Sequence, residues 1–421
     1  MPETQLPDWY HDGIDHIWLP YTQMQTAKPP LPVIKSDGVR LTLADGRELV
    51  DGIASWWAAA HGYNHPHVLK AVETQLKEMP HVMFGGLVNE PALRLSKRLA
   101  AMLPGDLDRC FIAESGSVSV EVAMKMAVQY FLNKGESRSK FVHFRGCYHG
   151  DTLGTMGVCD PEEGMHNLFG DVIADNILCD LPRTEAEAAK FTIFLKKNAH
   201  TIAAVITEPL VLGAGGMIFY PPETLKWLRS ACDEAGVLLI IDEIFTGFCR
   251  TGTMFAVEQA GIVPDMITLS KALSGGVSPL SVCAARDHIF DAFLSEDPTK
   301  ALMHGPTYMA HALGCAAANA SLDLFEREDR LGQVAKIEQQ LKDELAPCRD
   351  LPNVKDVRVK GAIGVVQLHD ASNIDALKPK FVDAGVWIRP FRDIVYLTPS
   401  LTISAEDLSI LTNTIFSTLN G

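Results

Sequence analysis

Residues 237–243 read VLLIIDE, and residues 266–271 read MITLSK. Each segment is a short apolar run that ends on polar residues. An apolar run without alternation is typical of a strand buried on both faces, and such strands belong to parallel sheets covered by helices. We therefore expect Asp242 and Lys271 at the carboxyl ends of two strands, where an open α/β sheet binds its ligands.

Further strands and helices are predicted on both sides of these segments. Strands are expected at 109–113, 140–144, 202–207 and 281–285, and helices at 91–102 and 118–131. This alternation is typical of the α/β class, with a mostly parallel sheet.

The two ends of the chain have a different pattern. Residues 33–50 predict short strands separated by the turns Asp37-Gly38 and Asp45-Gly46. After about residue 321, strands at 354–359, 363–368 and 395–398 and helices at 331–345, 374–384 and 405–419 predict a separate α+β unit. We expect three parts: an N-terminal arm and part of a small domain (1–55), a large domain (56–325) and a C-terminal small domain (326–421).

Composition limits the classes of function. The 421 residues are 47% hydrophobic and 21% charged, the balance of a globular protein, and the net charge of −15 argues against a surface for nucleic acid or anionic membrane. Nine cysteines without a CxxC pair favour reduced thiols in a cytoplasm over disulfides or a zinc site. We find no signal peptide and no bilayer-spanning apolar run, and therefore expect a soluble cytoplasmic protein without a metal.

An amine and a carboxylate in one crevice suit pyridoxal 5′-phosphate (PLP). The PLP aldehyde needs a lysine, here Lys271, and its pyridine nitrogen needs an acidic partner, here Asp242. The carboxylate favours the protonated nitrogen, and burial lowers the lysine pKa so that the amine can act as a base. The alternative is that Asp242 caps a helix and Lys271 is a solvated surface amine.

Other segments can complete such a site, and each has a plain structural alternative. Gly116 and Ser117 begin a predicted helix and can bind phosphate, or form an ordinary helix cap. Tyr148 can stack on a flat ring or pack in the core. Pro306 and Thr307, in the segment His304-Gly-Pro-Thr307, can hold a phosphate oxygen or belong to a plain loop.

Three more segments suit a substrate. Arg389 can bind a carboxylate in bidentate fashion or form a structural salt bridge. Trp56-Trp57, with Tyr21 far upstream, can wall an apolar substrate channel or lie in the core.

Two long segments resemble the signature of the class III (ω-type) aminotransferases: residues 239–252, LIIDEIFTGFCRTG, and 270–276, SKALSGG. Residues 18–22, 55–66, 81–86, 304–307 and 385–391 are similar to one branch of this family, and the match covers nearly the whole chain. Cys249 stands where the motif usually has Gly, and His311-Ala312 where Asn-Pro is usual.

The resemblance implies a fold type I PLP-dependent transferase, with a seven-stranded, mostly parallel sheet, that forms a homodimer with shared active sites. It implies the biotin-pathway reaction in which S-adenosylmethionine gives its amino group to 8-amino-7-oxononanoate. Lys271 and Asp242 take the roles given above, with Tyr21 near the reacting end of the substrate. Gly116, Ser117 and Tyr148 bind the cofactor, and Pro306 and Thr307 reach it from the partner subunit. The implied substrate contacts are Trp56, Tyr148, Lys271, Gly305, Arg389 and Tyr396.

Four alternatives remain open at this point. They are a class III enzyme for ornithine, 4-aminobutyrate or another ω-amine, a lysine-using version of the same step, a non-catalytic PLP-fold protein, and a nicotinamide dehydrogenase. The run Gly213-Ala-Gly-Gly216 departs from the GxGxxG spacing, which argues against the dehydrogenase.

Overall fold

A seven-stranded sheet forms the centre of the larger part of the molecule. The structure, a computed structural model, describes residues 6–162 and 166–421. The strand order is β4-β12-β11-β10-β7-β5-β6, and β12 runs antiparallel to both of its neighbours while the pairs among β11, β10, β7, β5 and β6 are parallel. The strands are β4 (Arg109–Ala113), β5 (Lys140–Phe144), β6 (Ile177–Cys179), β7 (Ile202–Thr207), β10 (Leu238–Asp242), β11 (Met266–Leu269) and β12 (Ser281–Ala285). The predicted α/β class and mostly parallel seven-stranded sheet are confirmed.

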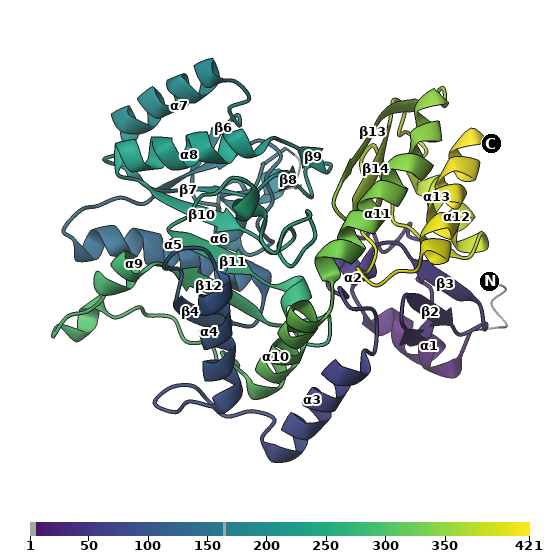
Figure 1. The fold of residues 1–421 in the computed structure, drawn as a ribbon, viewed down its shortest axis with the longest axis horizontal. Coiled ribbons are helices and arrows are strands. Elements are labelled where there is room, and N and C mark those ends of the chain that lie inside the picture. The colour runs from purple at the N-terminus through teal and green to yellow at the C-terminus, as the bar shows by residue number, and fades with distance from the viewer. Residues whose placement is uncertain (1–5, 163–165) are drawn as a thin grey trace.

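Helices cover both faces of this sheet (Figure 1). One face carries α5 (Gly116–Asn133), which contacts β4, β7, β10, β11 and β12. The other carries α8 (Pro222–Ala235), which packs on β10 and on α7 (Glu185–Asn198). Burial on both faces explains why β7, β10, β11 and β12 are mostly apolar and fully buried.

Three more helices pack beside the sheet. They are α3 (Pro66–Glu78), α4 (Glu90–Met102) and α10 (Ala312–Arg327), and α10 contacts both of the others. At the start of α10, the ring of His311 accepts a hydrogen bond from the Gly314 N–H at 3.3 Å. His311 therefore caps the helix at the position where the resembling family usually has Asn.

Two small sheets form the second body of the molecule. β13 (Val354–Lys360), β14 (Ile363–Leu368) and β16 (Ile394–Leu397) form one antiparallel sheet. In the other, β1 (Val33–Asp37), β2 (Arg40–Leu43) and β3 (Glu48–Asp51) are joined by β15 (Val386–Trp387), which pairs in parallel with β3. The N-terminal strands thus share a sheet with a C-terminal strand. The exact division at 55/56 and 325/326 remains a prediction.

Some elements differ from the sequence-based expectations. β6 and β15, of three and two residues, were not predicted because such short runs carry almost no periodicity. The helix predicted over 374–384 is a 3-10 turn, η8 (Ile374–Ala376), followed by α12 (Leu377–Asp383). Pro379 explains the late start, because proline has no N–H and fits only the first turn of a helix.

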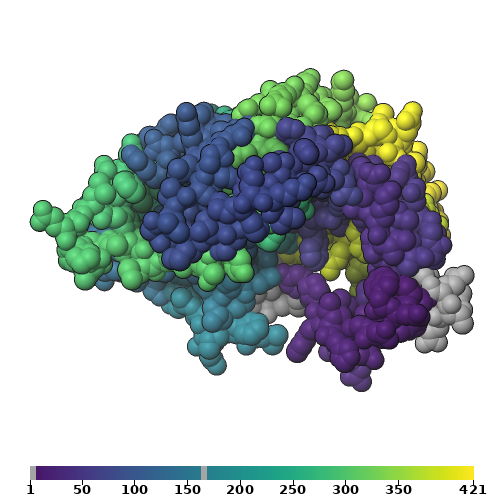
Figure 2. All heavy atoms as spheres, turned by 90° about the horizontal axis from the view of Figure 1, so that it is seen from below, coloured from purple at the N-terminus to yellow at the C-terminus, as the bar shows by residue number. Residues whose placement is uncertain are grey.

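Two long helices flank the second body, and the N-terminal arm lies beside it. α11 (Arg330–Leu345) and α13 (Ala405–Asn420) pack on each other, and the arm begins with α1 (Asp8–Gly13). Figure 2 shows the arm, in purple, projecting from the body with an opening beside it. In the described part of the chain, no helix is long and apolar enough to cross a membrane.

Candidate active site

A cavity lies at the carboxyl ends of the parallel strands. Its lining combines six residues predicted from the sequence with others that were not predicted. The predicted ones are Trp57, Gly116, Ser117, Tyr148, Asp242 and Lys271. The others are His149, Gly150, Glu208, Ala214, Ile244, Phe245 and Ser270. The prediction that Asp242 and Lys271 share one crevice is confirmed.

Lys271 lies two residues after the end of β11 and has a positive φ of 48°. Its Nζ lies 4.9 Å from the centre of the Trp57 ring. Burial lowers the pKa of Lys271, while the charges of Asp242 and Glu208 oppose the shift. A buried amine with a lowered pKa is a usable nucleophile and base near neutral pH.

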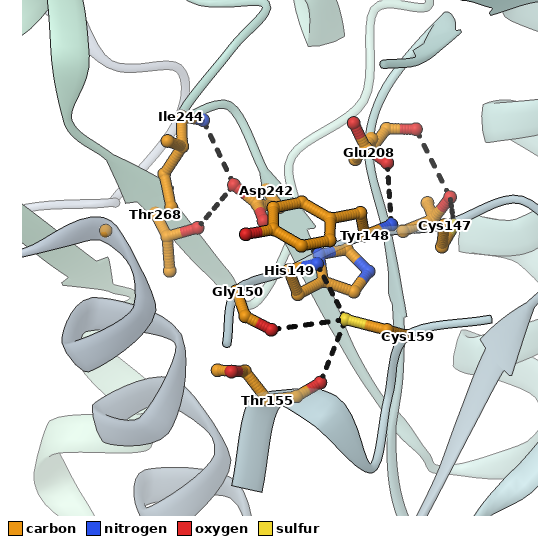
Figure 3. Close-up of polar contacts among 12 residues, drawn as sticks. Cys147, Tyr148, His149, Gly150, Thr155, Cys159, Glu208, Asp242, Ile244 and Thr268 are labelled. Atoms are coloured by element: carbon orange, nitrogen blue, oxygen red, sulfur yellow. Dashed lines mark hydrogen bonds and ion pairs between the residues drawn. The ribbon is translucent and has the colours of Figure 1, made fainter. Parts of the chain in front are cut away.

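Asp242 ends β10 and is held by three donors, shown in Figure 3. Its Oδ2 lies 2.7 Å from Nδ1 of His149. Its Oδ1 accepts hydrogen bonds from the Thr268 hydroxyl at 3.1 Å and the Ile244 N–H at 3.0 Å. These bonds fix the carboxylate, which lines the cavity together with Lys271.

His149 follows Tyr148 directly in the chain, and no sequence pattern assigns it a role. Its side chain has no exposed surface. Burial lowers the pKa of His149, but the hydrogen bonds to Asp242 and Cys147 have the larger, opposite effect and raise this pKa to about 10. The pair therefore consists of a protonated imidazole and a carboxylate, since each stabilises the charge of the other.

Glu208 is a second buried carboxylate at the cavity. One oxygen accepts a hydrogen bond from the Tyr148 N–H at 3.0 Å and the other from the Gly213 N–H at 2.9 Å. Burial raises its pKa to about 7. Glu208 follows β7 directly, so the strand-end argument that found Asp242 also applies to it.

The start of α5 offers a site for an anion. Ser115 caps this 18-residue helix, and Gly116 and Ser117 line the cavity at its N-terminus, where backbone N–H groups are free to bind phosphate. Gly150 makes room for Ser117, because a Cβ at residue 150 would lie 2.1 Å from the Ser117 Oγ.

The residues therefore fit PLP. A lysine, an acid and a helix N-terminus surround one cavity, and the Tyr148 ring lies over His149 on the same side as Asp242 (Figure 3).

Three predicted substrate residues lie together near this cavity. The Tyr21 ring is edge-on to the Trp56 ring, with centroids 6.5 Å apart, and Cζ of Arg389 lies 4.6 Å from the centre of the Trp56 ring. The Tyr21 hydroxyl is 3.3 Å from that of Tyr148 and donates a short hydrogen bond to Asp151. The aromatic wall and the guanidinium expected from sequence are thus side by side.

Four other predicted residues do not line this cavity, and their roles remain predictions; Tyr396 interacts with Trp57 and Arg389. Tyr396 is 2% exposed, packs edge-on against Phe391 and does not line the cavity. Gly305, Pro306 and Thr307 do not line it either, within the described ranges. Their loop is tied to α5, where Nζ of Lys125 donates to the Met303 carbonyl at 2.6 Å.

Trp56 and Trp57 belong to an unusual turn. Residues 54–57 all have positive φ, with values of 46°, 48°, 54° and 74°, and none of them is glycine. The left-handed conformation costs roughly 1–2 kcal/mol per L-residue. Cys249 also has a positive φ, 68°, at the position where the resembling family usually has Gly.

Comparison with known proteins identifies the class of protein. The sequence profile of the class-III aminotransferases matches residues 21–419. The chain belongs to the class-III aminotransferase family, which argues against the nicotinamide dehydrogenase alternative.

Particular relatives share one name. The chain is 42% identical over 412 residues, 96% of each chain, to the adenosylmethionine-8-amino-7-oxononanoate aminotransferase of Buchnera aphidicola from Acyrthosiphon pisum. It is 41% identical to the enzyme of that name from Mycobacterium leprae, with 94% of this chain and 93% of the other covered.

Solved structures agree with the fold. The enzyme of the same name from Methanocaldococcus jannaschii superimposes with a TM-score of 0.92 at 30% identity, with 97% and 98% of the two chains covered. A PLP-bound amine transaminase from an uncultivated Pseudomonas species superimposes with a TM-score of 0.89 at 32% identity, with 96% and 98% covered.

Proposed function

We propose that this protein is a PLP-dependent aminotransferase that transfers the amino group of S-adenosylmethionine to 8-amino-7-oxononanoate, giving 7,8-diaminononanoate for biotin synthesis. The observation that carries the proposal is the arrangement of Lys271, Asp242 and the start of α5 around one cavity, with the Trp56–Arg389 pair beside it. The shared name of the relatives supports this choice of substrates.

The chemistry of the two substrates suits Trp56, Tyr21 and Arg389 beside the cavity. Both are linear and carry a carboxylate, which the Arg389 guanidinium suits. The methylene chain of one substrate suits the Trp56 indole, and the sulfonium of the other is attracted to aromatic faces such as those of Trp56 and Tyr21.

Each residue of the cavity has a distinct task. PLP, when bound, supplies an electron sink for the carbon that loses its proton. Lys271 binds the cofactor, and its Nζ then takes the proton from the Cα of the amino donor. Asp242 holds a proton on the pyridine nitrogen, and Gly116 and Ser117 bind the phosphate. Because both substrates use one site, they react in turn, by a ping-pong mechanism.

An absorbance titration of the holoenzyme tests the proposal. Adding S-adenosylmethionine alone should bleach the absorbance of the bound cofactor, and adding 8-amino-7-oxononanoate should restore it. Bleaching by lysine alone would support the lysine-using version of this step. Bleaching by ornithine or 4-aminobutyrate alone would support another class III activity, and no bleaching by any amine would support a non-catalytic protein.

We also propose a homodimer with shared sites. The loop of Gly305, Pro306 and Thr307 does not line the cavity of its own subunit, and Met303 and Tyr308 beside it are 74% and 59% exposed. We infer that this loop reaches the phosphate site of the partner subunit.

Mixed dimers test this arrangement. Lys271→Ala and Thr307→Asp should each inactivate a homodimer, the second because its charge repels phosphate. Mixing the refolded or co-expressed variants should restore about a quarter of the wild-type activity, since half the dimers then contain one intact site. No recovery in confirmed mixed dimers would contradict shared sites.

We further propose that the enzyme acts in the cytoplasm. All nine cysteines are free, as expected for a reducing compartment. Fractionation of the source cells would test this location.

A further inference from the structure

The left-handed turn at residues 54–57 needs something to hold it. Ser55 has φ 48° and ψ 59°, and Trp56 has φ 54° and ψ 50°. L-residues avoid this conformation, and consecutive examples persist only where the surrounding structure enforces them. The turn matters for the site because it carries Trp56 to Arg389 and Trp57 to Lys271.

The carboxylate of Asp51 makes the contacts that hold this turn. Asp51 ends β3 and is 2% exposed. Its Oδ1 accepts from the Ile53 N–H at 2.9 Å, and its Oδ2 accepts from the Ser55 N–H at 3.0 Å and from the Tyr63 hydroxyl. Tyr63 in turn is hydrogen-bonded to the Ser55 hydroxyl. One side chain therefore binds both the entry and the interior of the turn.

The position of Asp51 also connects the turn to Arg389. Asp51 is in register with Trp387 of β15, and Arg389 follows two residues later. The paired ends of β3 and β15 thus lead into the left-handed turn along one chain segment and to the Arg389 guanidinium along the other. A carboxylate buried here is costly, and burial raises the pKa of Asp51 despite its hydrogen bonds. The backbone N–H groups of the turn need an acceptor, which is a reason for burying the Asp51 carboxylate despite its desolvation cost.

We propose that Asp51 is a positioning residue for substrate: its carboxylate holds the left-handed turn that sets Trp56 against Arg389 and Trp57 against Lys271. It acts through these residues and touches neither the substrate nor the cofactor. The proposal depends on the cavity being the active site, but not on the identity of the amino donor.

Asp51→Ala and Asp51→Asn test this role in the holoenzyme. The first removes both acceptors and the second keeps one. We expect the KM for 8-amino-7-oxononanoate to rise about tenfold or more in Asp51→Ala and about threefold in Asp51→Asn, with a smaller change in kcat. In crystals of either holoenzyme, at least one of residues 54–57 should leave the left-handed region.

Asp45→Asn is the matched control. Asp45 also accepts a backbone N–H, that of Arg47 at 3.1 Å, but it lies in the turn between β2 and β3 away from the tryptophans. Its loss should leave KM unchanged. If Asp51→Ala fails to fold, Asp51→Asn and Tyr63→Phe provide the same measurements.

Two results would overturn the proposal: a turn that keeps its conformation in the Asp51 variants together with an unchanged KM, or an equal rise in KM in Asp45→Asn. A purely structural role would lower the thermal midpoint and the active fraction without moving KM. If the wild-type enzyme does not turn over these substrates, the proposed function fails, whereas the crystallographic conformation of residues 54–57 still decides the role of Asp51.

Discussion

The imidazole of His149 lies directly behind Asp242, with Nδ1 2.7 Å from Oδ2, and both side chains are almost completely buried. Because the pKa of His149 is raised, the imidazole is protonated and donates a hydrogen bond to the Asp242 carboxylate. A buried ion pair of this kind costs desolvation energy, so it is weak evidence for stability. Its consequence is functional: the contact helps to fix the direction in which the Asp242 carboxylate points.

Replacing Asp242 with Asn tests the charge. Asn keeps the shape but cannot favour a protonated pyridine nitrogen, so we expect turnover to fall on the order of 10³-fold while PLP still binds. Single-turnover kinetics and the absorbance of the bound cofactor measure the two effects. Thr268→Val, which removes only a hydroxyl donor to Asp242, should have a much smaller effect. Near-normal turnover in Asp242→Asn would exclude the electron-sink role.

Replacing His149 with Gln tests the support behind Asp242. The charge partner is lost while Asp242 itself remains, so turnover should fall about 10- to 100-fold, the range seen when the outer partner of an active-site ligand is removed. His143→Gln is the control, because His143 is also buried but is hydrogen-bonded to neither Asp242 nor PLP-site residues in the described structure. Equal losses in both variants would mean that the effect is general destabilisation.

The sequence predicts the chemical groups of the site, but it does not predict the backbone conformation of the residues around them. Asp242 and Lys271 were predictable because each follows a buried strand, and parallel strands bring their carboxyl ends to one edge. Glu208 follows β7 in the same way, so the same argument places it at this edge of the sheet.

The backbone around the tryptophans was not predictable. Residues 54–57 contain no glycine or Asn, so no local signal indicates a left-handed turn. We infer that side-chain hydrogen bonds from Asp51 and Tyr63, four and eight residues away from Ser55, hold this conformation, and residue preferences for a turn do not take such bonds into account. Likewise, Tyr396 lies on the edge strand β16 and is nevertheless 2% exposed, so its burial depends on side chains that pack against it, such as Phe391.

Replacing Arg389 with Ala tests the binding of the substrate carboxylate. A charge-assisted hydrogen bond is worth about 1.5–3 kcal/mol, so KM should rise about 10- to 100-fold for both substrates. The cofactor content should stay unchanged. Arg389→Lys should recover only part of the affinity, because an ammonium lacks the planar fork of a guanidinium. An unchanged KM for both substrates in Arg389→Ala would refute this role.

His61, a buried histidine near Lys271, should make the free energy of unfolding depend on pH. Nδ1 of His61 accepts a hydrogen bond from Nε of Arg330 at 3.1 Å, so Nε2 carries the proton and faces Ser321 Oγ at 3.0 Å. Ser321 in turn donates to the carbonyl of Ala272, next to Lys271. Burial and the charge of Arg330 lower the pKa of His61 to about 3. The folded state therefore requires a neutral His61.

The sign follows from linkage. An unfolded His61 titrates near 6.5, so its contribution is complete above that pH and is lost as pH falls through 6.5 toward 3. At pH 4.5 the loss is roughly 2–3 kcal/mol. His61→Gln loses the contacts of the imidazole, so it should have a lower free energy of unfolding than the wild type at pH 7.5. Because glutamine does not titrate, this gap in the free energy of unfolding should shrink or reverse at pH 4.5. Urea unfolding at the two pH values measures the gap. His200→Gln, at an exposed turn, should show none, and a pH-independent gap for His61→Gln would show that protonation of this ring does not limit stability in acid.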